Sequence, residues 1–293
     1  MGSRLAIVPI LWNNDDLPEL TQPETRFEEI ASACEQLGFD GVEMGSNFPE
    51  DATALRSALK RRHLALAAAR FGPDLLKIGE RSANLEAAHR VAQLLARVEA
   101  LVLVVPEVLR PERNLFAGSA GPAQRASRAD FDMLVAGVEE VARRIQPLGV
   151  TCAFHNHAGS FVETEEEIDR FLADTDPGLV KFCLDTGHAT VGGANPVALA
   201  RRYASRIVHV HLKDVDPAVL SELRTKRFGF LQGVRSFLFC EPGRGCARIA
   251  ETVAVLKESG FQGWYVAEQD TTRLGPLESA RISHDFLAPL ISS

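Results

Sequence analysis

Histidines and carboxylates gather at four places in the second half of the chain, each at the end of a short apolar run. The four segments are Phe154-His155-Asn156-His157, Leu184-Asp185-Thr186-Gly187-His188, His209-Val210-His211-Leu212-Lys213-Asp214 and Ala267-Glu268-Gln269-Asp270. Imidazole and carboxylate groups together suit divalent ions of borderline character, such as manganese, cobalt, iron or zinc, and do not suit calcium or a thiolate-bound metal. If the four segments converge on one point, they build a metal site.

Each of these residues also has a structural explanation. A single histidine at a strand end is more often hydrogen-bonded than metal-bound, and His209 is the weakest candidate because it lies two residues deeper than His211. Lys213 and Asp214 can form a solvated pair, although a lysine beside a carbonyl substrate can also balance the charge of an enolate. Packing alone explains the whole set poorly, because buried ionisable groups are unfavourable unless they are paired or bound to a metal.

Two earlier loops carry groups that can contact a polyol. The first loop offers Trp12 and Asn13, and the second offers Glu43, Asn47 and Phe48. Amide and carboxylate groups bind hydroxyls, and an aromatic ring packs on the apolar face of a cyclic substrate. As isolated residues they occur more often in caps and turns.

Eight short apolar runs alternate with longer amphipathic segments along the chain. The expected strands are Leu5–Ile10, Gly41–Met44, Leu64–Ala69, Ala100–Val105, Val150–His155, Val180–Leu184, Arg206–His211 and Gly263–Glu268. The expected helices are Thr25–Leu37, Ala52–Arg62, Leu85–Arg97, Arg128–Leu148, Thr164–Ala173, Pro196–Tyr203, Ile249–Ser259 and Leu277–Leu290. This alternation is typical of parallel β-α units, so we expect one α/β domain over residues 1–293, a (β/α)8 TIM barrel with its reactive groups at the C-terminal strand ends. The long connections Pro106–Ser127 and Val215–Gly245 are expected to be functional.

Composition and charge exclude several classes of function. The 293 residues are 46% hydrophobic and 24% charged, which is ordinary for a globular protein. A net charge of −7 leaves no cationic excess for nucleic acid, and no apolar run approaches the length of a membrane span. The five cysteines form no C-x-x-C pair, which is typical of a reducing compartment. We therefore expect a cytoplasmic protein that acts on a small polar substrate, with neither nucleic acid nor a membrane as partner.

The same phrases resemble the xylose-isomerase-like barrels, a family that includes sugar isomerases, epimerases and endonuclease IV. The resemblance spans essentially the whole chain, and it is carried by AIVPILWNNDDLPEL at 6–20, GFDGVEMG at 38–45, HNH at 155–157, LDTGH at 184–188 and HVHLKDV at 209–215. The first phrase is specific to a dehydratase branch, the inosose dehydratases, whereas the LDTGH and HxHxKD phrases are shared more widely.

The resemblance implies a metal site and an activity. The implied ligands of a divalent ion, with Mn²⁺ or Co²⁺ first and Zn²⁺, Fe²⁺ or Mg²⁺ as alternatives, are His155, Asp185, His211 and Glu268. The implied reaction is loss of water from a cyclic keto-polyol such as 2-keto-myo-inositol. We expect the proton donor and acceptor to be among His157, His188 and Glu43. The candidate substrate-binding residues are Trp12, Asn13, Asn47, Phe48 and Lys213.

Two segments depart from the dehydratase pattern and keep other activities open. Residues 45–49 read GSNFP where that branch commonly has GNKFP, and residues 240–245 read CEPGRG. A keto-sugar isomerase or epimerase, or a lyase that cleaves a 3-keto-glycoside by β-elimination, would use the same metal site. A metal-free sugar-binding protein is a further alternative, whereas an endonuclease would need more ligands and a cationic groove. The resemblance also allows association into homo-oligomers.

Overall fold

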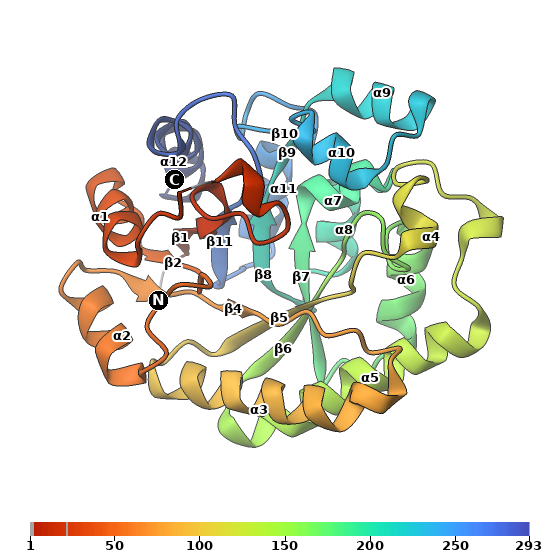
Figure 1. Cartoon of the computed structure of the whole chain (residues 1–293), viewed down its shortest axis with the longest axis horizontal. Helices are drawn as coiled ribbons and strands as arrows, with labels where there is room; N and C mark the ends of the chain where they lie inside the picture. The colour runs from red at the N-terminus through yellow and green to blue at the C-terminus, as the bar shows by residue number, and fades with distance from the viewer. Residues whose placement is uncertain (1–2, 22, 293) are drawn as a thin grey trace.

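The computed structural model describes residues 3–21 and 23–292, which form a parallel sheet wrapped by helices (Figure 1). The sheet strands are β1 Arg4–Ile7, β2 Gly41–Val42, β3 Ala65–Leu66, β4 Ala69–Arg70, β5 Val102–Pro106, β6 Thr151–His155, β7 Val180–Asp185, β8 Ile207–Leu212 and β11 Trp264–Ala267. They pair in the order β3-β2-β1-β11-β8-β7-β6-β5-β4. The first and last strands of the chain are therefore neighbours.

The sheet closes into a barrel because β3 and β4 are two halves of one strand. Only Ala67 and Ala68 separate them, and β3 pairs with β2 while β4 pairs with β5. Met44 follows β2, and its N–H donates to the Ala68 carbonyl at 2.9 Å. Hydrogen bonding to the β2 side therefore continues through the segment between β3 and β4. Counted as one strand, they complete a (β/α)8 barrel among the described residues, and the predicted fold class is confirmed.

Eight of the helices among the described residues form the outer ring. They are α1 Phe27–Leu37, α2 Ala52–Lys60, α3 Arg81–Arg97, α5 Arg128–Ile145, α6 Glu165–Asp174, α8 Pro196–Arg202, α11 Ile249–Glu258 and α12 Pro276–Ser292, and each overlaps a predicted helix. Local chemistry sets several of their ends. Thr164 and Glu167 form a capping box at the start of α6, and Gly38 follows α1 in the left-handed conformation, with φ of 85°.

Further elements lie inside the connections, and most of them were not predicted from the sequence. They are α4 Pro111–Asn114, α7 Thr186–Val191, α9 Pro217–Lys226, α10 Phe230–Arg235, the antiparallel pair β9 Asp214–Val215 and β10 Phe239–Cys240, and the 3-10 helices Pro9–Leu11, Pro18–Leu20, Ile78–Glu80, Pro122–Gln124 and Gln146–Leu148. Most are too short to show a helical or strand period. No helix among the described residues is long and apolar enough to cross a membrane.

The barrel interior changes from small apolar side chains to polar ones toward the C-terminal strand ends. Two buried clusters of mostly small residues fill its lower part: Ala6, Ala67, Trp264 and Val266, and Ala68, Val104, Ala153 and Cys183. In the register of β7 and β8, Cys183 lies opposite His209 and Asp185 lies opposite His211. The barrel therefore carries its ionisable groups at the end where its loops open.

Candidate active site

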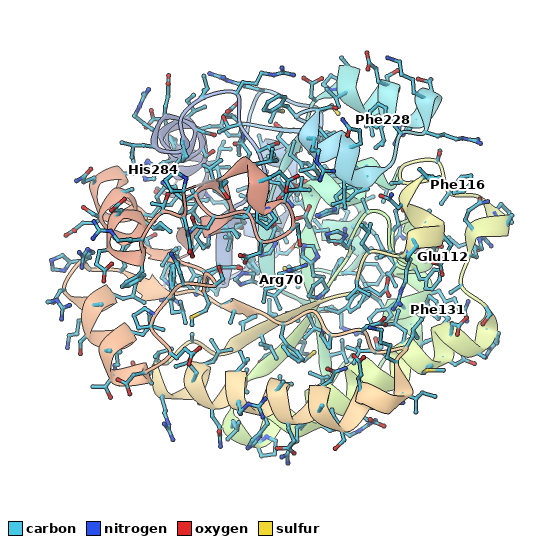
Figure 2. The ribbon with its side chains drawn as sticks, in the orientation of Figure 1. Arg70, Glu112, Phe116, Phe131, Phe228 and His284 are labelled. Atoms are coloured by element: carbon cyan, nitrogen blue, oxygen red, sulfur yellow. The ribbon has the colours of Figure 1, made fainter. Side chains whose placement is uncertain are left out.

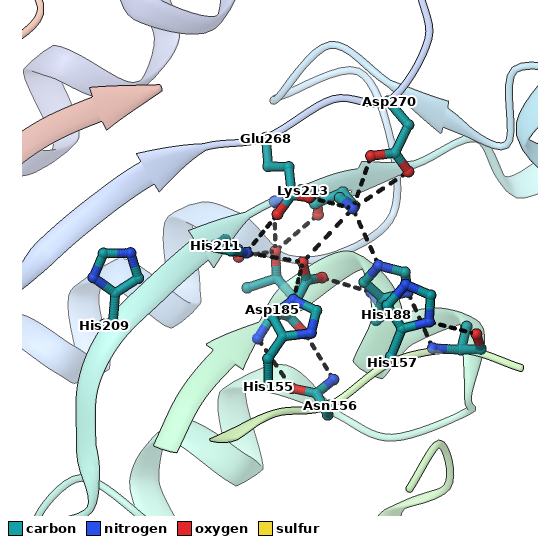
Figure 3. A network of polar contacts seen from close by, with 12 residues as sticks. His155, Asn156, His157, Asp185, His188, His209, His211, Lys213, Glu268 and Asp270 are labelled. Carbon is teal, nitrogen blue, oxygen red and sulfur yellow. Dashed lines mark hydrogen bonds and ion pairs between the residues drawn. The ribbon is translucent and has the colours of Figure 1, made fainter. Parts of the chain in front are cut away.

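Strand register brings the four predicted metal ligands to one point (Figure 3). His155 ends β6, Asp185 ends β7, His211 lies on β8, and Glu268 directly follows β11. One donor atom from each lies within 4.8 Å of the others, and all four side chains are buried. Their grouping agrees with the expectation from the sequence, while their role as ligands stays a prediction.

Two buried atoms in this group have lone pairs that face each other. The His211 Nε2–H donates to Glu43 Oε1 at 2.9 Å, which leaves His211 Nδ1 without a hydrogen when the imidazole is neutral. This Nδ1 lies 2.5 Å from Glu268 Oε2, yet neither atom has a hydrogen-bond partner among the described residues. Two acceptors so close need a cation between them, and a mixed imidazole and carboxylate set fits a divalent ion.

The pKa values of these residues also indicate that the group lacks a positive charge. Burial lowers the pKa of His211, but Cys183 and the Glu268 and Glu43 carboxylates together outweigh it and raise that pKa well above its ordinary value. A proton thus takes the place of the cation. Burial, reinforced by His211, lowers the pKa of His155 well below its ordinary value and keeps it a neutral ligand. Burial raises the pKa of Asp185 to about 7, although Lys213 opposes this shift.

Asp185 is held by the start of the helix that follows it. Its Oδ1 accepts the His188 N–H at 2.7 Å, which makes Asp185 the N-cap of α7. The Asp185 N–H donates to Asn156 Oδ1 at 3.1 Å, so the neighbouring strand holds the backbone. The remaining oxygen, Oδ2, lies 3.3 Å from His155 Nε2. The spacing of LDTGH therefore has a local cause, since a cap bonds the amide three residues later.

Lys213 lies beside the predicted ligands and is fully buried. Its Nζ lies 2.9 Å from Glu268 Oε1, 3.1 Å from Asp270 Oδ1 and 3.1 Å from His188 Nε2. Burial lowers its pKa, but the Asp270 and Glu268 carboxylates outweigh burial and raise that pKa, so the side chain is an ammonium. Asp270 was not among the predicted site residues. Its signal was its position two residues after Glu268, on the same side of an extended segment.

His157 and His188 form a pair of imidazoles next to this group. Their ring centroids lie 4.0 Å apart, and the Phe230 ring lies 5.4 Å from His157 and 5.6 Å from His188. Burial lowers the pKa of His157 to about 3. Burial also lowers the pKa of His188 well below its ordinary value, and the neighbouring His157 adds to this shift. Both are therefore neutral near pH 7.

A cavity of about 340 Å³ opens onto these groups. His155, His157, His188, His211 and Lys213 line its inner part, and Phe48, Phe230 and the half-exposed Arg70 are among its other walls (Figure 2 labels Arg70). The volume falls within the range of small-molecule sites. The second long connection supplies Phe230, Leu231 and Val234, whereas residues 106–127 do not line the cavity.

Several predicted substrate-binding residues lie elsewhere or are engaged. Trp12 is 6% exposed and packs in the core outside this cavity. Asn47 also lies outside, because its Nδ2 donates to the Thr25 carbonyl at 2.7 Å. Asn13 lines the cavity, but its side chain bonds to the Thr25 N–H and carbonyl, both at 2.8 Å. The two asparagines hold the segment before α1, whereas Phe48 and Lys213 line the cavity as predicted.

Glu43, a predicted proton donor or acceptor, is 2% exposed and bonded to two imidazoles. Its Oε1 lies 2.5 Å from His209 Nε2 and 2.9 Å from His211 Nε2. Burial raises the pKa of Glu43, but His211 and His209 outweigh it and lower that pKa to about 2. This contact orients His211 instead of presenting a free carboxylate to substrate, and it gives His209 a structural role.

Both the sequence and the fold of this chain are similar to those of known proteins. Residues 31–290 match the family model described as xylose isomerase-like TIM barrel. An inosose dehydratase of Clostridium beijerinckii is 34% identical over 288 residues, which cover 97% of this chain and 96% of the relative. An inosose dehydratase of Geobacillus kaustophilus is 35% identical and covers 98% and 94%. Among solved structures, the probable 3-DHS dehydratase AsbF of Bacillus anthracis shares the fold, with a TM-score of 0.73, 16% identity and coverage of 98% of this chain and 99% of that one.

Proposed function

The chain belongs to the xylose isomerase-like TIM barrel family, and on that premise we propose that it is an inosose dehydratase, a divalent-metal-dependent lyase. Its substrate is a cyclic keto-polyol, 2-keto-myo-inositol, from which it removes water. Full-length likeness to dehydratases at 34% identity supports the reaction type, and the cavity of about 340 Å³ is of suitable size for a six-membered ring.

The observation that carries the metal requirement is the pair of facing lone pairs between His211 and Glu268. The ligands are His155, Asp185, His211 and Glu268, whose donor atoms lie within 4.8 Å of one another. When bound, a divalent ion supplies a Lewis acid that favours removal of a hydrogen from the carbon beside a carbonyl. Manganese and cobalt are the first candidates, because the donor set mixes two imidazoles with two carboxylates.

The remaining polar residues of the cavity handle protons and charge. His157 and His188 are neutral imidazoles on the cavity wall, where they can accept a proton or donate a hydrogen bond. The Lys213 ammonium lies beside them and balances negative charge that develops on the substrate. Phe48 and Phe230 supply the apolar walls for the ring carbons.

The proposal is tested with purified protein, Mn²⁺ or Co²⁺, and 2-keto-myo-inositol. We expect the absorbance of an enone to increase, and we expect a product whose mass is that of the substrate less one water. Solvent deuterium incorporated into recovered substrate or its isomers, without loss of water, would instead identify an isomerase or epimerase. An unchanged substrate in the presence of bound metal would reject the dehydratase assignment.

A further inference from the structure

The two cavity imidazoles are held in opposite tautomers by the backbone of a single residue. The rings of His157 and His188 are inclined to each other by 31°, and the backbone of Ala158 hydrogen-bonds to both. The Ala158 carbonyl accepts a hydrogen bond from His157 Nδ1–H at 2.8 Å. The Ala158 N–H donates to His188 Nδ1 at 3.1 Å. Because a carbonyl only accepts and an amide N–H only donates, the backbone fixes which nitrogen of each neutral ring carries the hydrogen.

The outer nitrogens of the two rings therefore differ: one carries a free lone pair and the other carries a hydrogen. His157 carries its hydrogen on Nδ1, so its Nε2 has a free lone pair, and none of the described residues bonds to that nitrogen. The Lys213 ammonium also faces His188 Nε2 at 3.1 Å, but it has Glu268 and Asp270 as acceptors, whereas the Ala158 N–H has only His188 Nδ1 among the described residues. We therefore place the His188 hydrogen on Nε2, which makes that nitrogen a donor. Both residues line the cavity, so the substrate meets one proton acceptor and one hydrogen-bond donor.

A second hydrogen-bond donor, the Lys213 ammonium, lies beside His188 Nε2–H. The two groups face each other across 3.1 Å, and neither can accept a hydrogen bond from the other. An oxygen about 3 Å from both nitrogens would accept a bond from each of them. This is a position for a substrate oxygen on which negative charge grows.

We infer, on the basis of the proposed dehydration, that His157 is the base that carries the proton and that His188 is a fixed neutral donor. The C–H bond beside the carbonyl breaks, and its proton goes to His157 Nε2. The electron pair first moves onto the carbonyl oxygen as an enolate, from which the proton can be returned and so exchanged. The enolate then re-forms the carbonyl, and the electron pair becomes the new carbon–carbon double bond as the β C–O bond breaks. The departing hydroxide takes the proton back from His157 and leaves as water, so the imidazole returns to its starting state.

The tautomers can be measured without any substrate. Long-range ¹H–¹⁵N NMR of the histidine-labelled, Zn²⁺-loaded protein distinguishes Nδ1–H from Nε2–H imidazoles, and the His157→Gln and His188→Gln variants assign the two signals. We expect His157 as the Nδ1–H form and His188 as the Nε2–H form. The same form at both residues, or the reversed pair, would overturn the inference even if the protein dehydrates 2-keto-myo-inositol.

The split of roles is then measured with the substrate in D₂O. His157→Gln should lose both exchange of the hydrogen beside the carbonyl and loss of water, by about 10²- to 10⁴-fold. His188→Leu should lose about 10²- to 10³-fold in water loss, and His188→Gln should recover most of it, because an amide N–H can replace the donor. His63→Gln, on an exposed residue, is the control. Persistent exchange in His157→Gln, or no recovery in His188→Gln, would overturn the assignment. A wild-type protein that neither exchanges nor dehydrates would reject the proposed function, while the NMR result would still decide the tautomers.

Discussion

Removal of the Glu43 carboxylate is expected to weaken metal binding although Glu43 is not a proposed ligand. Its Oε1 accepts hydrogen bonds from both His209 and His211, at 2.5 Å and 2.9 Å. The bond to His211 holds the hydrogen on Nε2 and so turns the Nδ1 lone pair toward Glu268 and Asp185. Such a partner fixes the orientation and tautomer of a histidine ligand and raises its basicity.

The size of the effect depends on how much of the contact a substitution removes. Outer partners of histidine ligands contribute about 10- to 100-fold in metal affinity, or about 1.4 to 2.8 kcal/mol. Glu43→Gln keeps an oxygen that accepts both bonds and loses only the charge, so we expect about a tenfold loss. Glu43→Ala removes the acceptor and leaves two buried imidazoles unpaired, so we expect a loss nearer 100-fold.

Isothermal titration of chelator-stripped protein with Zn²⁺ measures this affinity directly. Co²⁺ binding, followed by its visible spectrum, shows at the same time whether the coordination geometry has changed. The matched control is Glu50→Gln, because Glu50 lines the same cavity but is exposed and belongs neither to the four proposed ligands nor to their histidine and carboxylate partners. Unchanged affinity in Glu43→Ala, or an equal loss in the control, would refute the role given to Glu43.

Three further predictions concern the ligands and their neighbours. Asp185→Asn or Glu268→Gln should lose bound metal by elemental analysis, and full occupancy in both variants would refute the site. Metal affinity should fall by at least tenfold per pH unit below pH 7, because the pKa values of Asp185, about 7, and of His211 are both raised and protons must leave both groups before metal binds. A flat affinity from about pH 6 to pH 8 would contradict this. Gly187→Ala should slow dehydration while metal stays bound, because its Cβ would lie 2.6 Å from Lys213 Cγ, whereas Gly275→Ala, with open space around it, should retain the wild-type rate.

The barrel and the cluster of ligands could be predicted from the sequence because both follow from strand position. In a barrel of parallel strands the carboxyl ends share one rim, so Asp185 and Glu268 had to lie close together once their strands were recognised. The strand predicted as one run at Leu64–Ala69 is found as β3 and β4, with Ala67 and Ala68 between them. Alternation along an extended strand likewise places His209 and His211 on one face.

The residues of the loops could not be placed in the same way. Asn13 and Asn47 have the right chemistry for a polyol, but both bind Thr25, and no periodic signal shows the direction of a loop side chain. Glu43 was predicted as a proton donor or acceptor. Its contacts with His209 and His211 could not be predicted, because these residues lie on a strand more than 160 residues away in the sequence. The role of Ala158 was invisible, since its contribution comes from backbone atoms that every residue type possesses.

The central claim is that four strand ends hold one divalent ion that dehydration requires. Its most direct test is the rate of enone formation from 2-keto-myo-inositol as Mn²⁺ or Co²⁺ is returned in steps to chelator-stripped protein. We predict no reaction in the stripped protein, and a rate that rises in proportion to bound metal up to one ion per chain. The same rate with and without metal, or no enone from the fully loaded protein, would contradict the claim.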